Sequence, residues 1–133
     1  MALLCTVWLL VALVPLRVWR GTVGGLPECT AEGDPRLALQ LAAHIERAAW
    51  RMPLAIKCLP QAIALSWQLR RLGLCHRVVF AVRPPAQRDS GDALHAWVEC
   101  GGEIILGDLP GPWITVHRQG CDAVITQPNL SDC

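Results

Sequence analysis

The chain contains a thiol, an imidazole and a carboxylate in positions that suit a cysteine hydrolase, namely Cys58, His95 and Asp108. In such an enzyme the thiolate attacks a carbonyl, the imidazole transfers the proton, and the carboxylate orients the imidazole ring. Cys58 opens an apolar run in which Pro60 suits the first turn of a helix. A cysteine at a helix N-terminus ionises readily, because the helix dipole and the free N–H groups stabilise the thiolate. Cys58 is therefore the candidate nucleophile.

His95 and Asp108 are expected to lie opposite one another in a β-hairpin. The pair Gly101-Gly102 separates residues 94–100 from residues 103–107, and both segments have the composition of strands. Two glycines between strands are typical of a type I′ turn, which needs positive φ at both central positions. A two-residue turn places His95 opposite Asp108, with Cβ atoms roughly 4.5–5.5 Å apart. The carboxylate of Asp108 would then fix the tautomer of His95.

Other interpretations of these residues stay open. A slip of one residue in the hairpin would turn the opposing side chain to the other face, and the reserve carboxylates are then Glu99 and Asp92. A thiolate–imidazole zinc site is a weaker alternative, since no short paired spacing supports it, and it would draw on Cys58, His95, Cys100 and Cys121. A helical cysteine and a strand histidine are also common in ordinary packing. Trp97, on the same face as His95, is expected in the core rather than as a shield of the site.

Composition excludes several classes of protein. The 133 residues suit one domain over 1–133, and 53% hydrophobic with 17% charged residues provide for a core and argue against disorder. A net charge of +1 without a long basic run gives no sign of a nucleic-acid partner. The seven cysteines are an odd number, contain no Cys-x-x-Cys pair, and in several cases lie in apolar runs. We therefore expect mainly reduced thiols and a reducing compartment.

Helical patterns fill the first half of the chain. Asp34 and Pro35 suit the N-cap and the first position of a helix over 36–50, and Gly73 suits the end of a second helix over 58–72. The first helix has an apolar stripe that we expect to face the core, formed by Leu37, Leu41, Ile45 and Ala48. The second helix is apolar over most of its surface and is therefore expected to be central.

Strand-like segments follow the helices. They cover 77–83, 94–100 and 103–107, with shorter ones at 114–116 and 123–126. This order predicts an α+β fold in which the helices pack on a small antiparallel sheet. We divide the single domain into an apolar helix over 1–20, a helical part over 36–72 and a sheet part over 77–126. The surface is the expected place for His76 and His117.

The segment 1–16 is almost wholly apolar. A signal peptide would place a basic residue before the apolar stretch, whereas Arg17 and Arg20 come after it. A helix of this length reaches only about 24 Å, short of the roughly 30 Å hydrocarbon core of a membrane. We therefore expect a helix packed against the rest of the domain, and membrane contact through 1–16 is a less favoured alternative.

Two stretches of the sequence together resemble a known family. The first reads Cys58-Leu59-Pro60-Gln61-Ala62-Ile63-Ala64-Leu65 and continues to Leu69-Arg70-Arg71-Leu72-Gly73. The second reads Leu94-His95-Ala96-Trp97-Val98-Glu99 and follows Val78-Val79-Phe80-Ala81-Val82. Both resemble the transglutaminase-like leader peptidases of lasso-peptide biosynthesis, which cut the leader from a precursor peptide. The resemblance covers residues 36–110, and the apolar amino-terminal helix also resembles the start of the family.

The resemblance implies a papain/transglutaminase-like cysteine protease core without a cofactor, in which Cys58 is the nucleophile, His95 the general base and acid, and Asp108 the orienting acid. It implies a lasso precursor peptide as substrate, an ATP-dependent macrolactam synthetase as partner, and a location in the bacterial cytoplasm. Only 57 residues precede Cys58 and none reads as a strand-rich module, so a separate leader-recognition protein is expected. The alternatives are a transglutaminase-like acyltransferase, another cysteine hydrolase, and a noncatalytic peptide-binding module of the same fold.

Overall fold

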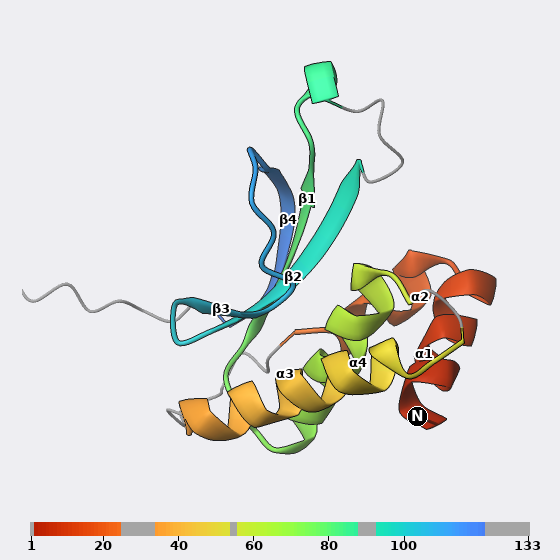
Figure 1. Ribbon diagram of the computed structural model, residues 1–133, viewed down its shortest axis with the longest axis vertical. Coiled ribbons are helices and arrows are strands. Elements are labelled where there is room, and N and C mark those ends of the chain that lie inside the picture. Colours follow the sequence, from red (N-terminus) through yellow and green to blue (C-terminus); the bar gives the residue numbers. More distant parts are fainter. Residues whose placement is uncertain (1, 25–33, 54–55, 88–92, 122–133) are drawn as a thin grey trace, which may run out of the picture.

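A computed structural model describes the protein over residues 2–24, 34–53, 56–87 and 93–121. Helices come first along the chain and strands follow, and the helices pack against a four-stranded antiparallel sheet (Figure 1). The hydrophobic core lies between these two layers, because its buried side chains come from both helices and strands. The expected α+β fold is therefore confirmed.

The apolar amino-terminal segment is helical and packs on the domain. It forms three short elements in succession, α1 (Ala2–Leu13), α2 (Leu16–Trp19) and the 3-10 turn η1 (Arg20–Thr22). Leu4 and Val7 on α1 are buried, which confirms the packed helix. It is not one helix over 1–20, because Pro15 has no N–H to continue the helical ladder. Among the described residues, no helix combines the length and the apolar character needed to cross a bilayer.

Helix α3 (Pro35–Trp50) begins where its sequence predicts. The Asp34 carboxylate accepts a hydrogen bond from the Arg36 backbone N–H at 2.9 Å and caps the first turn. The expected stripe is confirmed at Ile45, while the other fully buried side chains, Ala38, Ala42 and Ala49, each lie one position after a predicted one. Leu41 and Ala48 are partly buried against the core. The small, fully buried alanines let α3 approach its neighbour closely, while the larger Leu37 is left at the rim, 36% exposed.

Helix α4 (Cys58–Arg71) is the central helix of the molecule, as predicted. It contacts α1, α3 and both central strands of the sheet, and Figure 1 shows it between α3 and α1. Its buried residues run almost continuously through Ala62, Ile63, Ala64, Leu65, Ser66 and Leu69. Gly73, with φ +69°, adopts the left-handed conformation that ends the helix.

The sheet has the order β3-β2-β1-β4, and its strands are β1 (Arg77–Val82), β2 (Leu94–Cys100), β3 (Glu103–Leu106) and β4 (Ile114–Gly120). A 3-10 turn, η2 (Pro85–Gln87), follows β1. The short strand expected at 114–116 therefore extends to Gly120, and the one at 123–126 lies outside the described residues. In Figure 1 the ends of β1, β2 and β4 that lie farthest from β3 project beyond the helices.

The hairpin of β2 and β3 contains the expected two-residue turn but not the expected register. Gly101 and Gly102 both have positive φ, and Cys100 lies opposite Glu103. Between Val98 and Glu99 the register shifts, because β3 carries one extra residue there. The expected pairing of His95 with Asp108 is therefore wrong.

A buried polar network joins the amino-terminal segment to α4 and β1. The Ser66 hydroxyl lies 2.7 Å from His76 Nε2 and accepts a hydrogen bond from the Gly24 N–H at 2.7 Å. His76 Nδ1 lies 2.9 Å from the Leu74 carbonyl, which can only accept, so Nδ1 carries the proton and Nε2 accepts from the Ser66 hydroxyl. The expected surface position of His76 is wrong, since its side chain is 2% exposed. His117 is exposed, as predicted.

The cysteines do not all carry free thiols. Cys75 and Cys121 are disulfide-bonded, whereas Cys5, Cys58 and Cys100 are free. Disulfides persist in oxidising compartments and are rare where thiols are kept reduced. The disulfide bonding of these two cysteines therefore argues against the expected reducing compartment.

Candidate active site

Cys58 lies at the first position of α4, where the sequence predicts it. The preceding residue, Lys57, has extended backbone angles and does not cap the helix with its side chain, so the first turn keeps free N–H groups. Partial burial raises the pKa of the Cys58 thiol, but the hydrogen bond with His95, the backbone N–H groups of Ala96 and Leu59 and the charge on the imidazole outweigh it. The pKa of Cys58 is therefore lowered, and the thiolate is stabilised.

His95 lies near the start of β2 and its side chain is 4% exposed. Its Nε2 lies 2.6 Å from the Gly107 carbonyl. A carbonyl oxygen can only accept, so Nε2 carries a proton and Nδ1 faces the Cys58 thiol. The hydrogen bond with Cys58 raises the pKa of His95, burial opposes this shift, and the Gly107 carbonyl supports it. The pair can therefore exist as thiolate and imidazolium, the ionised form that a cysteine nucleophile needs.

Asp108 does not contact His95. Its side chain is exposed, and it forms no hydrogen bond or ion pair with any residue that the structure describes. The bulge in β3 brings the backbone of Gly107, rather than the next side chain, to the imidazole. The group that fixes the His95 tautomer is thus a backbone carbonyl, and the residue that supplies it is Gly107.

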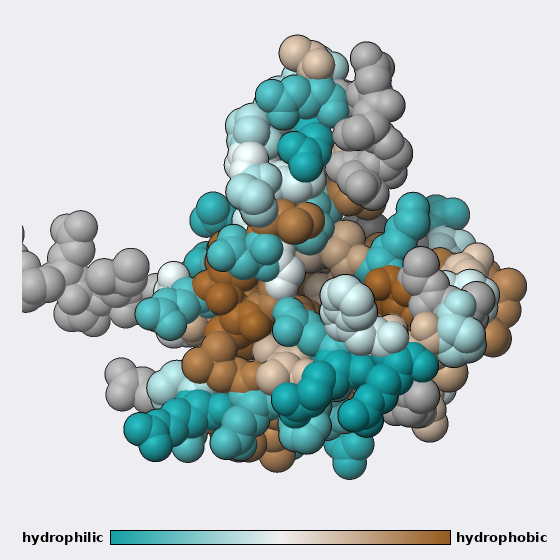
Figure 2. Space-filling view, viewed as in Figure 1, coloured by the Kyte–Doolittle hydropathy of each residue, from teal (hydrophilic) through white to brown (hydrophobic). Residues whose placement is uncertain are grey.

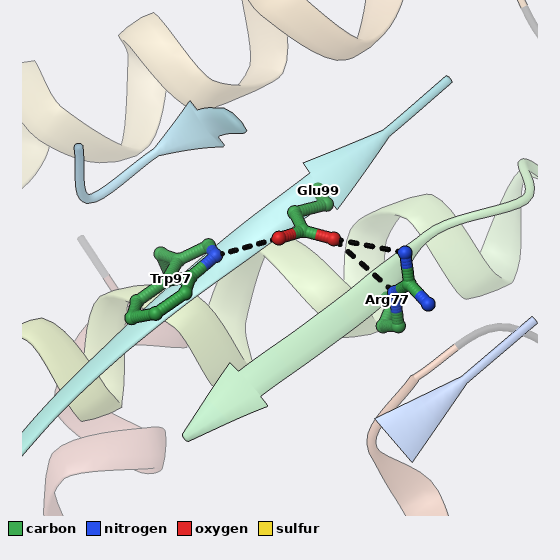
Figure 3. A network of polar contacts seen from close by, with 3 residues as sticks. All are labelled: Arg77, Trp97 and Glu99. Atoms are coloured by element: carbon green, nitrogen blue, oxygen red, sulfur yellow. Dashed lines mark hydrogen bonds and ion pairs between the residues drawn. The ribbon is translucent and has the colours of Figure 1, made fainter. Parts of the chain in front are cut away.

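The reserve carboxylate Glu99 has a structural role instead. Figure 3 shows its two oxygens held by two neighbours, since Oε1 accepts from Trp97 Nε1 at 2.9 Å and Oε2 lies 3.0 Å from an Arg77 guanidinium nitrogen. The other reserve carboxylate, Asp92, lies outside the described residues. Trp97 is half-buried and stands outside the core cluster, with its ring centroid 5.9 Å from that of His95. The expectation that Trp97 belongs to the core is therefore wrong, and the ring flanks His95.

Two residues that the sequence did not single out complete the surroundings of His95. The Trp113 ring lies 5.0 Å from the His95 ring, and the Arg83 guanidinium lies 4.4 Å above the Trp113 ring centroid. The positive charge of Arg83 opposes protonation of His95. Nothing in the spacing of the sequence predicts either contact, because both residues lie outside the hairpin that contains His95.

A cleft of about 560 Å³ opens at the Cys58–His95 pair. Its walls come from three parts of the molecule: α1, the start of α4, and the sheet with its connecting loops. This volume falls in the range of ligand-binding clefts, roughly 300–1,000 Å³. The Cys58–His95 pair is therefore accessible to a ligand from one side.

The zinc alternative finds no support in the described residues, which contain no group of three ligands that could hold a metal ion. The Cys100 thiol donates to the Cys75 carbonyl at 3.1 Å, and Cys121 is disulfide-bonded. Neither sulfur is therefore placed beside Cys58 and His95 as a ligand.

Comparison with known protein families identifies the superfamily to which the chain belongs. The profile of the Transglutaminase-like superfamily matches residues 3–117. The chain belongs to the transglutaminase-like superfamily. A transglutaminase-like domain of this kind indicates cysteine protease or acyltransferase-type activity, in agreement with the Cys58–His95 pair. Searches of curated proteins and of solved structures found no match to this transglutaminase-like chain.

Proposed function

We propose that the chain is a cysteine peptidase that removes the leader peptide from a lasso-peptide precursor. The observation that carries the catalytic part is the hydrogen-bonded pair of Cys58 and His95 at the mouth of an open cleft. The resemblance of residues 36–110 to leader peptidases supports the peptide substrate. Membership of the transglutaminase-like superfamily agrees with the chemistry.

The proposed reaction follows from the geometry of the pair. The Cys58 thiolate attacks the carbonyl carbon of the scissile peptide bond, and the backbone N–H groups at the start of α4 stabilise the developing oxyanion. His95 gives its Nδ1 proton to the leaving amine, and the C–N bond breaks to leave a thioester on Cys58. Water then attacks the thioester, His95 accepts a proton from it, and the free thiol and a new carboxylate are released.

The proposal assigns Asp108 a supporting role. The Gly107 carbonyl makes the contact with His95, and the Asp108 carboxylate follows it directly in the chain. In the proposal this carboxylate favours the imidazolium by its charge rather than by a hydrogen bond. The further partners in the proposal are a separate leader-recognition protein and an ATP-dependent macrolactam synthetase, which would take over the freed amino terminus of the core peptide.

The deciding experiment is incubation of the purified chain with a cognate precursor, with and without a recognition protein, followed by mass spectrometry. We expect cleavage by the wild type and near-complete loss with Cys58→Ala and His95→Ala. Cys5→Ala is the matched control, because Cys5 is a free, exposed thiol outside the cleft. Cleavage that survives Cys58→Ala would contradict the peptidase, and a product joined to an added amine would favour the acyltransferase. Equal cleavage without the recognition protein would refute only the two-protein arrangement.

A further inference from the structure

Helix α1 supplies one wall of the catalytic cleft, although no step of the chemistry uses it. The side chains of Trp8, Val11 and Ala12 line the cleft. The adjoining stripe of the same helix is anchored in the core by Leu4 and Val7, which are 1% and 0% exposed. The wall is therefore held in a fixed place relative to the catalytic pair, as a specificity pocket requires.

The other walls of the cleft are also apolar beside the catalytic pair. Leu94 and Leu109 line it and are 56% and 49% exposed, and Trp113 stands next to His95. Trp8 on the facing wall is 37% exposed. In Figure 2, which colours each residue by hydropathy, brown residues occur among paler and teal ones on the side of the molecule where Figure 1 places α1. Large apolar side chains that stay exposed around one cleft fit an apolar ligand group, since its burial removes them all from water.

The charged side chains in the described part of the cleft lining are basic. Lys57 and Arg83 line the cleft, and none of the described lining residues is an aspartate or a glutamate. Lys57 is exposed and directly precedes the nucleophile in the chain. Lys57 therefore places a positive charge in the cleft next to the nucleophile, and this charge attracts a negative group on the substrate close to the reacting bond.

We propose that the cleft selects peptides that carry a large apolar side chain, seated against the Trp8–Ala12 wall of α1, and an acidic residue within reach of Lys57. This inference rests on the proposed peptidase function and names the substrate class of the same site. The apolar group supplies most of the affinity, because it is buried between two walls. The acidic group determines orientation, since Lys57 attracts it to a position next to the nucleophile.

Binding to the inactive Cys58→Ala protein tests the selection separately from cleavage. Fluorescein-labelled peptides are compared by anisotropy: one with a Phe and a Glu near the scissile bond, one with Phe changed to Ala, and one with Glu changed to Gln. We expect the change of Phe to weaken binding by about tenfold or more, and the change of Glu to weaken it by several-fold. Equal affinity for all three peptides, or no binding at millimolar concentration, overturns the proposal.

Two variants, each with a matched control, test which residues of the protein select the peptide. Ala12→Trp fills the apolar wall, whereas Leu13→Trp adds a ring at a neighbouring position that does not line the cleft and is 72% exposed. Lys57→Glu reverses the charge in the cleft, whereas Arg51→Glu reverses an exposed charge at the end of α3. We expect Ala12→Trp to abolish the preference for Phe, and Lys57→Glu to turn the preference from Glu to Lys. The two controls should bind as the parent protein does, and an equal effect of variant and control overturns the assignment.

Cleavage of the same peptides by the wild type separates the two proposals. Selective binding without any cleavage refutes the peptidase and leaves the ligand class in place. Cleavage that ignores the Phe and the Glu refutes the ligand class and leaves the peptidase. Circular dichroism at the assay temperature verifies that each variant is folded, and Ala12 and Lys57 are both exposed, so the substitutions do not disturb the core.

Discussion

At the scale of residues, the site depends on a thiol and an imidazole that shift each other's pKa in opposite directions. The pKa of Cys58 is lowered and that of His95 is raised, and both shifts favour the thiolate–imidazolium pair. Both residues were predicted from sequence, because a helix start and a strand are local features. The Gly107 carbonyl that orients His95 was not predicted. Every residue has a backbone carbonyl, and the sequence does not show which one reaches the ring.

Removal of the imidazole should change the ionisation of Cys58. In His95→Ala the thiol keeps its burial, which raises its pKa, and loses the hydrogen bond and the charge that lower it. We expect the pH midpoint of Cys58 alkylation by iodoacetamide to move upward, with a slower reaction at neutral pH by on the order of tenfold. Peptide mass spectrometry quantifies the label, and the exposed thiol of Cys5 is the internal reference. An unchanged midpoint for Cys58 would contradict the pairing.

Substitution of Asp108 tests how much the neighbouring carboxylate contributes. We expect Asp108→Asn to lower kcat/KM less than His95→Ala does, because the contact with the ring is made by Gly107 and remains. General acid–base groups contribute roughly 10²- to 10⁴-fold, and a charge outside hydrogen-bond reach contributes less. Glu103→Gln, an exposed acid on β3, controls for the change in net charge. A loss with Asp108→Asn as large as that with His95→Ala would mean that the carboxylate reaches the ring during catalysis.

At the scale of elements, the bulge in β3 decides which group reaches His95. A regular hairpin would have continued the pairing that begins at Gly101-Gly102, and the extra residue moves every later position by one. The turn could be predicted because two glycines have a known conformation. The bulge could not, since the extra residue lies among ordinary aliphatic ones. The stripe of α3 was misplaced in part for a similar reason, because Leu37 and Ala38 are both apolar and only packing chooses between them.

Gly107 is the position at which the bulge and the catalytic pair can be tested together. It has φ +83°, and an added Cβ would lie 2.9 Å from the Ala96 carbonyl oxygen. Gly102 has φ +85° with open space around it, so Gly102→Ala carries the same backbone strain without the collision. We expect both variants to lose about 1 kcal/mol of stability from strain, and Gly107→Ala to lose more. Only Gly107→Ala should also lower the pH of the falling limb of the kcat/KM profile, since it displaces the acceptor of His95 Nε2.

At the scale of the whole molecule, the Ser66–His76 network holds together segments that are far apart in sequence. It connects Gly24, before α3, to the middle of α4 and to the start of β1. An added Cβ at Gly24 would meet the Gln119 backbone oxygen at 2.5 Å, so β4 passes close to the same point. The sequence indicated the helices, the sheet and their order, because these follow from periodicity. It placed His76 at the surface, because burial of a polar side chain depends on partners that only the tertiary fold brings together.

The network should make stability depend on pH. Burial lowers the pKa of His76, so the folded chain keeps it neutral while the unfolded chain takes up a proton near pH 6.5. Its contribution to stability is complete above about pH 6.5 and is lost as the pH falls below that value. His95 has the opposite sign, since its raised pKa adds stability at low pH that is lost as the pH rises.

The comparison of wild type with His76→Gln isolates this contribution, because His95 is present in both. We expect the melting temperature of the wild type to fall more than that of the variant on going from neutral to mildly acidic pH, by a few degrees. Thermal unfolding followed by circular dichroism measures it. His44→Gln, an exposed histidine on α3, should behave as the wild type does. Parallel pH profiles for wild type and His76→Gln would show that His76 is not the titrating group.

The contact between His95 and the Gly107 carbonyl has a consequence for how this enzyme can change over time. A carboxylate in that place could be replaced in one step by a neighbouring codon, with loss of charge and of activity together. A peptide oxygen depends on the shape of the bulge rather than on a functional side chain, and at Gly107 that shape requires a residue without a Cβ. Drift in the side chains around the turn is therefore tolerated as long as the kink survives. The contact with His95 therefore requires the bend at Gly107 and not an orienting side chain.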